Sequence, residues 1–153
     1  MKVIQVTPPY GNYDAGGPDG LVDGKHGKVN WRAGGWQGYL GCEMDVIVDL
    51  LGRRTVSSVS VEFLQDMNQY IWMPSVMEVY VSEDGGNFVK AGERRSDVPI
   101  DIEDILIQDW RGEFAPVEAT HVRIVAPQFG EIPSWHRGYG DKPFIFADEI
   151  SVR

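Results

Sequence analysis

The chain has little cysteine, little basic charge and no long hydrophobic run, and each shortage excludes a class of protein. Its 153 residues include one cysteine, Cys42, which excludes an internal disulfide. Lys and Arg number 14 against 23 Asp and Glu, so the formal net charge is −9. This balance argues against a nucleic-acid partner, because a phosphate backbone requires clustered cations. No apolar stretch approaches the ~20 residues of a membrane helix, so we expect no membrane insertion. Residues 2–6 are typical of a strand and not of a signal peptide.

The chain also lacks residues that zinc sites and nucleophilic catalytic centres require. One cysteine and three scattered histidines (His26, His121 and His136) argue against a zinc site. The sequence contains no Gly-x-Ser-x-Gly elbow and no cysteine with a flanking catalytic motif. The acidic residues leave a carboxylate pair for glycoside hydrolysis open, but most of them fall on strand faces and in turns. A hydrolase is therefore the weakest of the functional hypotheses.

What the chain does have is alternation of apolar and polar residues with a period of two, as in Val59, Val61 and Phe63. This alternation indicates half-buried strands with one wet face, as antiparallel sheets require. The segments that we expect to form strands are 2–6, 44–50, 58–63, 77–82, 87–91, 108–114, 121–126 and 144–152. With no helical pattern, linker or repeat, they predict a single all-β domain over residues 1–153, an eight-stranded antiparallel β-sandwich of the jelly-roll type.

The connections between these strands differ in length. If successive strands run antiparallel, the short connections 51–57, 83–87 and 115–120 lie at one end of the sandwich. The long connections 19–43, 65–74, 93–107 and 127–143 then lie at the other end. Long loops on a rigid scaffold commonly carry function, so we expect the binding surface at the second end.

Four of the five tryptophans fall in the long connections, and only Trp110 lies in an expected strand. The rings occur beside carboxylate, amide, imidazole and guanidinium side chains. Sugars need this mixture, because their hydroxyls require hydrogen-bonding partners and their C–H faces require an aromatic plane. The alternative is that these rings cap the core of the sandwich. The candidate carbohydrate-binding residues are Trp36, Asp66, Tyr70, Trp72, Trp135, His136 and Arg137.

Acidic residues in two separate segments suggest a metal site. Asp23 precedes a glycine in the first long connection, and Asp148 and Glu149 are adjacent near the C-terminus. Separated carboxylates together with loop carbonyls can form an oxygen-only site for calcium. Asp-Gly is also a common turn signal, so this spacing by itself is a weak indication.

Several motifs occur in an order that resembles a known family. They are Leu-Val-Asp-Gly at 21–24, Asn-Trp at 30–31, Trp-Gln-Gly at 36–38, the strand at 59–66, Val-Tyr-Val-Ser-Glu-Asp-Gly at 79–85 and Ala-Asp-Glu-Ile at 147–150. Together they resemble discoidin-like domains, which include coagulation-factor C-type domains and family 32 carbohydrate-binding modules. The tail from 135 to 150 looks especially like the C-terminal accessory domain of bacterial β-N-acetylhexosaminidases (chitobiases).

This resemblance implies a galactose-binding-domain-like sandwich that binds glycans through loops at one end and performs no catalysis. It also implies a structural Ca²⁺. Carried over to this sequence, its ligands are the Asp23 side chain, carbonyls around Lys25 and Lys28, the Asp148 carbonyl and Glu149. The hydroxyl residue that the family usually has after the Asp-Gly turn is missing here.

Our leading hypothesis is a noncatalytic module of a larger exported glycoside hydrolase, binding a terminal hexose or N-acetylhexosamine. Its location would be periplasmic, cell-surface or secreted, and its other partners would be neighbouring domains of the parent polypeptide. The alternative is an interaction module that packs on a catalytic domain through its aromatic residues and has no sugar site.

Overall fold

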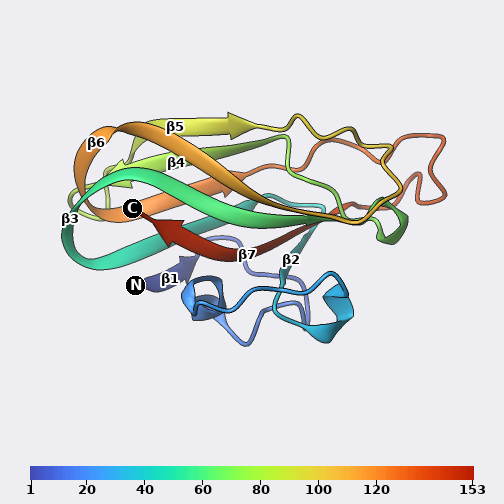
Figure 1. Cartoon of the computed structure of the whole chain (residues 1–153), viewed down its shortest axis with the longest axis horizontal. Coiled ribbons are helices and arrows are strands. Elements are labelled where there is room, and N and C mark those ends of the chain that lie inside the picture. The colour runs from blue at the N-terminus through green and yellow to red at the C-terminus, as the bar shows by residue number, and fades with distance from the viewer.

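The computed structural model describes residues 1–153 as an all-β body with a long irregular N-terminal segment (Figure 1). Its strands are β1 (Lys2–Gln5), β2 (Gln37–Leu40), β3 (Met44–Gln65), β4 (Val76–Ser82), β5 (Val89–Arg95), β6 (Leu106–Ala126) and β7 (Phe144–Val152). Three short 3₁₀ helices lie between strands: η1 (Pro18–Val22), η2 (Trp31–Ala33) and η3 (Met67–Gln69). None of these helices has the length and apolar composition needed to cross a membrane.

The two longest strands, β3 and β6, organise the sheet. They pair antiparallel from Met44 opposite Ala126 to Gln65 opposite Leu106. Both strands curve over together, so one half of the pair lies in the layer with β1, β4 and β5 and the other half lies with β2 and β7 (Figure 1). The strand order along the folded sheet is β2-β7-β3-β6-β4-β5, with β1 beside β3. The predicted all-β antiparallel sandwich is therefore confirmed.

The predicted strand boundaries need two corrections. Segments 51–57 and 115–120 were expected to be loops, but they continue β3 and β6 around the bend. The backbone bends here because Leu51 has φ 58° and Gly52 has φ 147°, and the pairing register shifts between Asp49 and Arg54. Four expected strands thus merge into two, while β2 forms inside a segment that was expected to be irregular.

One cluster of 23 buried hydrophobic residues fills the space between the two layers. Val48 and Ile124 enter it from the first layer, and Val61, Phe63 and Trp110 enter it from the second. The alternation in the sequence therefore marks these inward faces correctly, and Trp110 lies in β6 as predicted, where it is fully buried. The ring centroids of Phe63 and Trp110 are 5.3 Å apart in an edge-to-face arrangement.

The connections separate to opposite ends of the body, with one exception. The hairpin turn after β4 lies at the same end as the bends of β3 and β6, whereas segments 66–75, 96–105 and 127–143 lie at the far end, which we call the loop pole (Figure 1). The exception is the segment between β1 and β2, which packs along the body through Tyr13 and Trp31 against Phe146.

Replacing Phe63 by alanine tests the core. Phe63→Ala should lower the free energy of unfolding by about 3–5 kcal/mol, because the cavity beside Trp110 cannot collapse completely. Urea denaturation followed by tryptophan fluorescence measures the change. Val89 is 69% exposed, so Val89→Ala should change stability by no more than about 0.5 kcal/mol. Equal effects of the two substitutions would contradict this assignment of the core.

Candidate functional site

Two of the predicted sugar-binding tryptophans lie in the interior. Trp72 is 1% exposed, packs on Phe129 with ring centroids 4.9 Å apart, and donates from Nε1 to the Ile100 carbonyl at 2.9 Å. Trp36 is 2% exposed and donates from Nε1 to the Lys28 carbonyl at 2.9 Å. Neither ring presents a face to solvent, so the prediction that they form a ligand platform is wrong. They are amphipathic rings that find both an apolar environment and a hydrogen-bond partner inside the fold.

Asp66 and His136 are also buried and hold the loops at the pole together. The Asp66 backbone exchanges two hydrogen bonds with Ile71, which closes the turn that contains η3. His136 Nδ1 accepts from the Gly138 amide at 2.9 Å, so Nε2 carries the proton that is donated to the Met67 carbonyl, also at 2.9 Å. Their burial gives these two residues a role in positioning the surface, and their contact with a ligand remains a prediction.

The other predicted residues of this set reach the surface of the loop pole. Trp135 is 57% exposed and Arg137 is also exposed. Tyr70 is half-buried, with the Arg137 guanidinium carbon 5.6 Å from its ring centroid. Arg137 also donates to the Asn68 carbonyl, which joins segments 66–72 and 133–139. Trp135, Arg137 and Tyr70 therefore remain candidates for contact with a ligand.

Two hollows flank segment 139–143 at this pole. The first hollow has a volume of about 390 Å³ and includes Gln128, Glu131 and Tyr139 in its lining. The second hollow has a volume of about 450 Å³ and includes Tyr70 and Phe144. Gly140, Asp141 and Lys142 line both hollows, so this short segment is their shared wall. An aromatic ring, carboxylates and an ammonium group thus meet around a concave surface, which is the mixture that sugar recognition requires.

Tyr139, Glu131, Asp141 and Lys142 are not among the binding residues predicted from the sequence. Tyr139 is 65% exposed, and the signal that marks it is the glycine on each side in Gly138-Tyr139-Gly140. Glycine neighbours leave the ring free of packing partners along the chain. The three charged residues carry no such local signal, because charged loop residues are usually only solvated.

Backbone and amide hydrogen bonds fix the shared wall. The Gly41 amide donates to the Pro143 carbonyl at 2.8 Å, and the Asp141 amide donates to the Gly138 carbonyl at 2.8 Å. Gln128 Nε2 donates to the carbonyls of Tyr39 and Cys42, at 3.0 and 2.9 Å. Gln128 Oε1 is buried without a partner. The Gln128 amide therefore holds part of the lining of the first hollow in place, while its Oε1 is buried beneath the surface.

The predicted calcium ligands lie close together, but their hydrogen bonds do not fit an oxygen-only cradle. The Gly24 amide donates to Glu149 Oε2 at 3.0 Å, and the Gly27 amide donates to Asp148 Oδ2. The loop thus turns two peptide N–H groups toward these carboxylates. The Lys28 carbonyl is occupied by Trp36, and Asp23 is exposed and accepts from the Lys25 amide at 2.9 Å. Calcium prefers six to eight oxygen ligands, so this arrangement does not suit it, and calcium binding remains an untested prediction.

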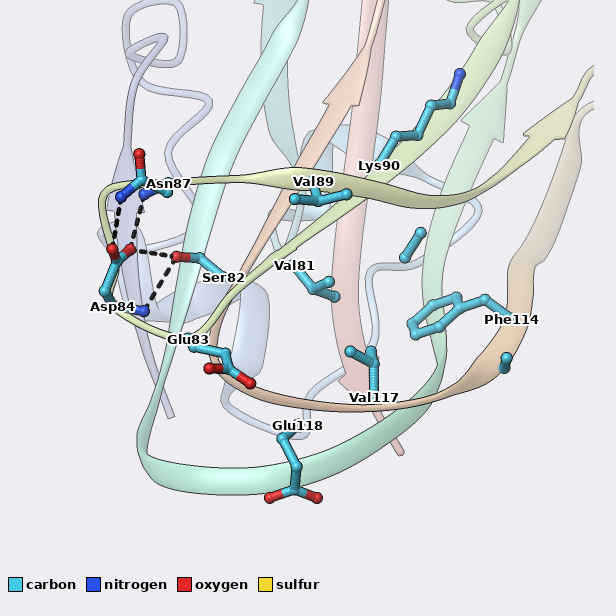
Figure 2. Close-up of a pocket in the computed structure, with 12 residues that line it drawn as sticks. Val81, Ser82, Glu83, Asp84, Asn87, Val89, Lys90, Phe114, Val117 and Glu118 are labelled. Atoms are coloured by element: carbon cyan, nitrogen blue, oxygen red, sulfur yellow. Dashed lines mark hydrogen bonds between the residues drawn. The ribbon is translucent and has the colours of Figure 1, made fainter.

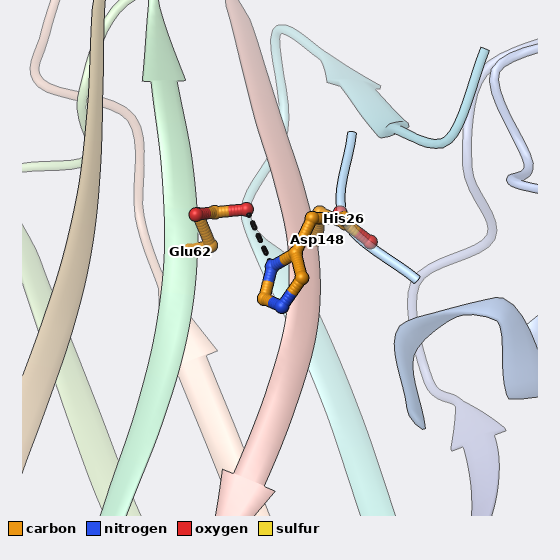
Figure 3. Close-up of side chains that lie close together, drawn as sticks. All are labelled: His26, Glu62 and Asp148. Atoms are coloured by element: carbon orange, nitrogen blue, oxygen red, sulfur yellow. Dashed lines mark hydrogen bonds and ion pairs between the residues drawn. The ribbon is translucent and has the colours of Figure 1, made fainter. Parts of the chain in front are cut away.

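A different group of side chains converges at the same place. His26, Glu62 and Asp148 each offer a ligand atom, and these atoms all lie within 4.8 Å of one another (Figure 3). His26 Nδ1 is 3.2 Å from Glu62 Oε2, and this hydrogen bond raises the pKa of His26. Burial raises the pKa of Asp148 to about 6, and burial also raises the pKa of Glu149. We call His26, Glu62 and Asp148 the junction cluster.

A third feature is an apolar cleft of about 570 Å³ at the end opposite the loop pole. Val81, Val89, Phe114 and Val117 line it, and Lys90, Glu83 and Glu118 stand around its rim (Figure 2). Asp84 closes the adjoining turn by accepting from the amides of Gly86 and Asn87, and these bonds lower its pKa. The apolar lining suits a hydrophobic group better than it suits a sugar.

Comparison with known proteins shows which fold these features belong to. No protein-family model and no curated protein matches the chain. A CBM32 module from Clostridium perfringens, CpGH89CBM32-5, solved in complex with GalNAc-β-1,3-galactose, has a TM-score of 0.59 and 21% sequence identity, covering 99% of this chain and 93% of that one. Chitosan-binding module 1 from a chitosanase/glucanase of Paenibacillus sp. IK-5 has a TM-score of 0.58 and 16% identity, covering 99% and 92%.

A third structure contains this fold as one part of a longer chain. Truncated AlyQ, with CBM32 and alginate lyase domains, matches with a TM-score of 0.59 and 14% identity over 99% of this chain and 31% of that chain. The protein therefore has the discoidin-like sandwich fold of CBM32 carbohydrate-binding modules, and the predicted resemblance is confirmed for the fold. The special likeness to chitobiases remains a prediction.

Replacing Asp148 by asparagine tests the buried carboxylate. A pKa that is higher in the folded protein than in the unfolded chain means that the fold loses stability as the pH rises through the interval between the two values. His26, also with a raised pKa, and Glu149 act in the same direction. With EDTA present, the free energy of unfolding should fall by about 1–2 kcal/mol between pH 5 and pH 8 because of Asp148.

Asp148→Asn should flatten this pH profile and raise stability at pH 8, as measured by urea denaturation at each pH. Carboxylates whose pKa is lowered, such as Asp84 and Glu93, remain ionised throughout this range and do not affect the comparison. Asp104→Asn, at an exposed position, serves as the control and should keep the wild-type profile. An unchanged profile in Asp148→Asn would show that Asp148 is not a destabilising buried charge.

Proposed function

We propose that this chain is a noncatalytic carbohydrate-binding module that holds a terminal sugar of a glycan at segment 139–143. The observation that carries the proposal is the pair of hollows on either side of this segment, with the exposed Tyr139 ring beside Glu131, Asp141 and Lys142. An exposed ring supplies a stacking plane, and the charged side chains supply acceptors and donors for sugar hydroxyls. The site is open and shallow, as expected for one or two sugar units.

The assigned roles follow from position. Tyr139 is the proposed stacking ring of the first hollow, and Gln128, held by its hydrogen bonds to two loop carbonyls, keeps part of the lining in place. Tyr70 is the proposed apolar wall of the second hollow. Trp135 and Arg137 extend the surface outside the hollows and would contact a second sugar unit or a linkage.

The ligand class that we favour is a terminal hexose or N-acetylhexosamine. Glu131 and Asp141, together with a net charge of −9, disfavour strongly acidic sugars by charge repulsion. The solved structures with this fold support glycan binding in general, since one is a complex with GalNAc-β-1,3-galactose and another is a chitosan-binding module. A parent glycoside hydrolase, and an exported location for it, are part of the same proposal.

Replacing the stacking ring tests the site. Tyr139→Ala should weaken the binding of the best monosaccharide by about tenfold or more, equivalent to about 1.4 kcal/mol, because it removes the aromatic plane. A glycan array followed by calorimetric titration with galactose, N-acetylgalactosamine and N-acetylglucosamine measures the loss. Wild-type dissociation constants should be millimolar to micromolar, since one sugar buries little area.

Two further variants make this experiment specific. Tyr80→Ala removes a tyrosine on β4, which lines neither hollow, and should bind as the wild type does. Trp135→Ala should weaken the binding of oligosaccharides more than the binding of monosaccharides, because Trp135 lies outside the hollows. Absence of binding to every glycan by correctly folded wild-type protein would reject the proposal.

The apolar cleft favours a second candidate function, docking of a neighbouring domain of the parent polypeptide. Val89 is 69% exposed on the edge strand β5 and lies beside the half-buried Phe114. An exposed apolar residue beside an aromatic ring is typical of a place where another side chain inserts. The cleft lies at the end opposite the loop pole, so docking there would leave the sugar hollows open.

A small aromatic probe tests this cleft. Indole at millimolar concentration should shift the NMR methyl resonances of Val81, Val89 and Val117, because these residues line the cleft. Val89→Asp should abolish those shifts by placing a charge at the mouth of the cleft, and it should leave sugar affinity unchanged. Shifts spread over the whole surface, or none at all, would argue against a docking site here.

A further inference from the structure

The junction cluster combines two carboxylates that are forced together by the pairing of strands. Glu62 of β3 and Asp148 of β7 are direct cross-strand partners, so their side chains start from neighbouring positions. The register shifts next to this pair, and the extra residue Glu149 has φ 29°. Like charges placed opposite each other destabilise a sheet, so a cation bound beside this pair would relieve the repulsion.

Asp148 supplies an independent indication of a cation. It is fully buried, its Oδ2 accepts from the Gly27 amide, and its Oδ1 has no hydrogen-bond partner. A buried carboxylate oxygen without a partner carries an uncompensated desolvation cost. The Gly27 bond fixes the carboxylate through one oxygen and leaves the other oxygen available, which is how a supporting hydrogen bond orients a metal ligand.

The imidazole nitrogen of His26 determines which kind of cation the donor atoms of the cluster suit. His26 Nδ1 lies 3.2 Å from Glu62 Oε2 (Figure 3), and one nitrogen and two carboxylate oxygens of the cluster lie within 4.8 Å of one another. Calcium and magnesium prefer sets made only of oxygen, whereas zinc binds imidazole nitrogen and carboxylate oxygen in tetrahedral sites. The adjoining hollow of about 310 Å³ is polar throughout: His26, Glu62 and Asp109 line it together with Arg111 and Arg153, so water has room to act as a fourth ligand.

We propose that His26, Glu62 and Asp148 bind a divalent transition metal, with Zn²⁺ as the best fit to the donor set. The sequence alone argues against zinc, because its histidines are scattered and the three ligands come from distant parts of the chain. The fold removes this objection by bringing the loop that carries His26 onto the β3–β7 pair. A bound ion would fasten the segment between β1 and β2 to the sandwich and stabilise the fold by mass action.

Metal titration of the whole chain tests the proposal in a Cys42→Ser background, because Cys42 is an exposed thiol that would bind zinc by itself. After EDTA treatment and removal of the chelator, Zn²⁺ should bind one site per chain by calorimetry and raise the melting temperature. Co²⁺ should give visible absorption bands of a nitrogen- and oxygen-ligated site. Ca²⁺ at the same concentration should have little effect on the melting temperature.

Substitutions assign the site to these residues. His26→Ala and Asp148→Asn should each weaken Zn²⁺ binding by at least about tenfold. His26 is exposed, so His26→Ala keeps the fold intact. His121→Ala removes a histidine that pairs with Asp49 at 3.8 Å elsewhere on the surface and should bind Zn²⁺ as the background protein does.

Three results would overturn the proposal. They are no saturable metal binding, Zn²⁺ affinity that is unchanged in His26→Ala, and stronger binding of Ca²⁺ than of Zn²⁺. The last result would instead assign the junction to calcium and to the oxygen ligands that the family resemblance implies. None of these readouts depends on sugar binding, so failure of the metal proposal can be distinguished from failure of the proposed function.

Discussion

The continuous pairing of β3 with β6 is the constraint on which the rest of the structure depends. Because the two strands stay hydrogen-bonded while both bend, a single sheet folds over and encloses one core. The same pairing leaves β3 open on its other side to pair with β7, and that places Glu62 opposite Asp148. It also sends segment 127–143, which follows β6, to the end where segment 66–75 follows β3. Both candidate binding features are thus consequences of one long strand pair.

The sequence predicted the strands and core of the sandwich well, but it predicted less well which loop side chains reach the surface. Alternation identified Val61 and Phe63 as core residues, because a period of two reports directly which face is buried. Trp72 and Trp135 looked equivalent as loop tryptophans, yet one is 1% exposed and the other 57% exposed. The difference lies in partners that are far away in sequence, such as the Ile100 carbonyl that receives the Trp72 indole N–H. No local pattern reports such a partner.

Two kinds of polar burial in this protein have opposite energetic consequences. His136 uses both ring nitrogens in hydrogen bonds, so its burial stabilises the loop pole and gives the surface above it a fixed shape. Asp148 uses only one oxygen, so its burial leaves a cost that the fold must offset elsewhere. Natural proteins commonly retain such unsatisfied groups where a ligand completes the set, and core packing alone gives no reason for a buried aspartate at this position.

The shared wall between the two hollows restricts how the loop pole can adapt to different occupants. Gly140, Asp141 and Lys142 are one short stretch of backbone with a hollow on each side. While the outer walls of the hollows stay in place, a displacement of this backbone that widens one hollow narrows the other. Under that condition, an occupant that pushes on the stretch from one side changes the space available on the far side.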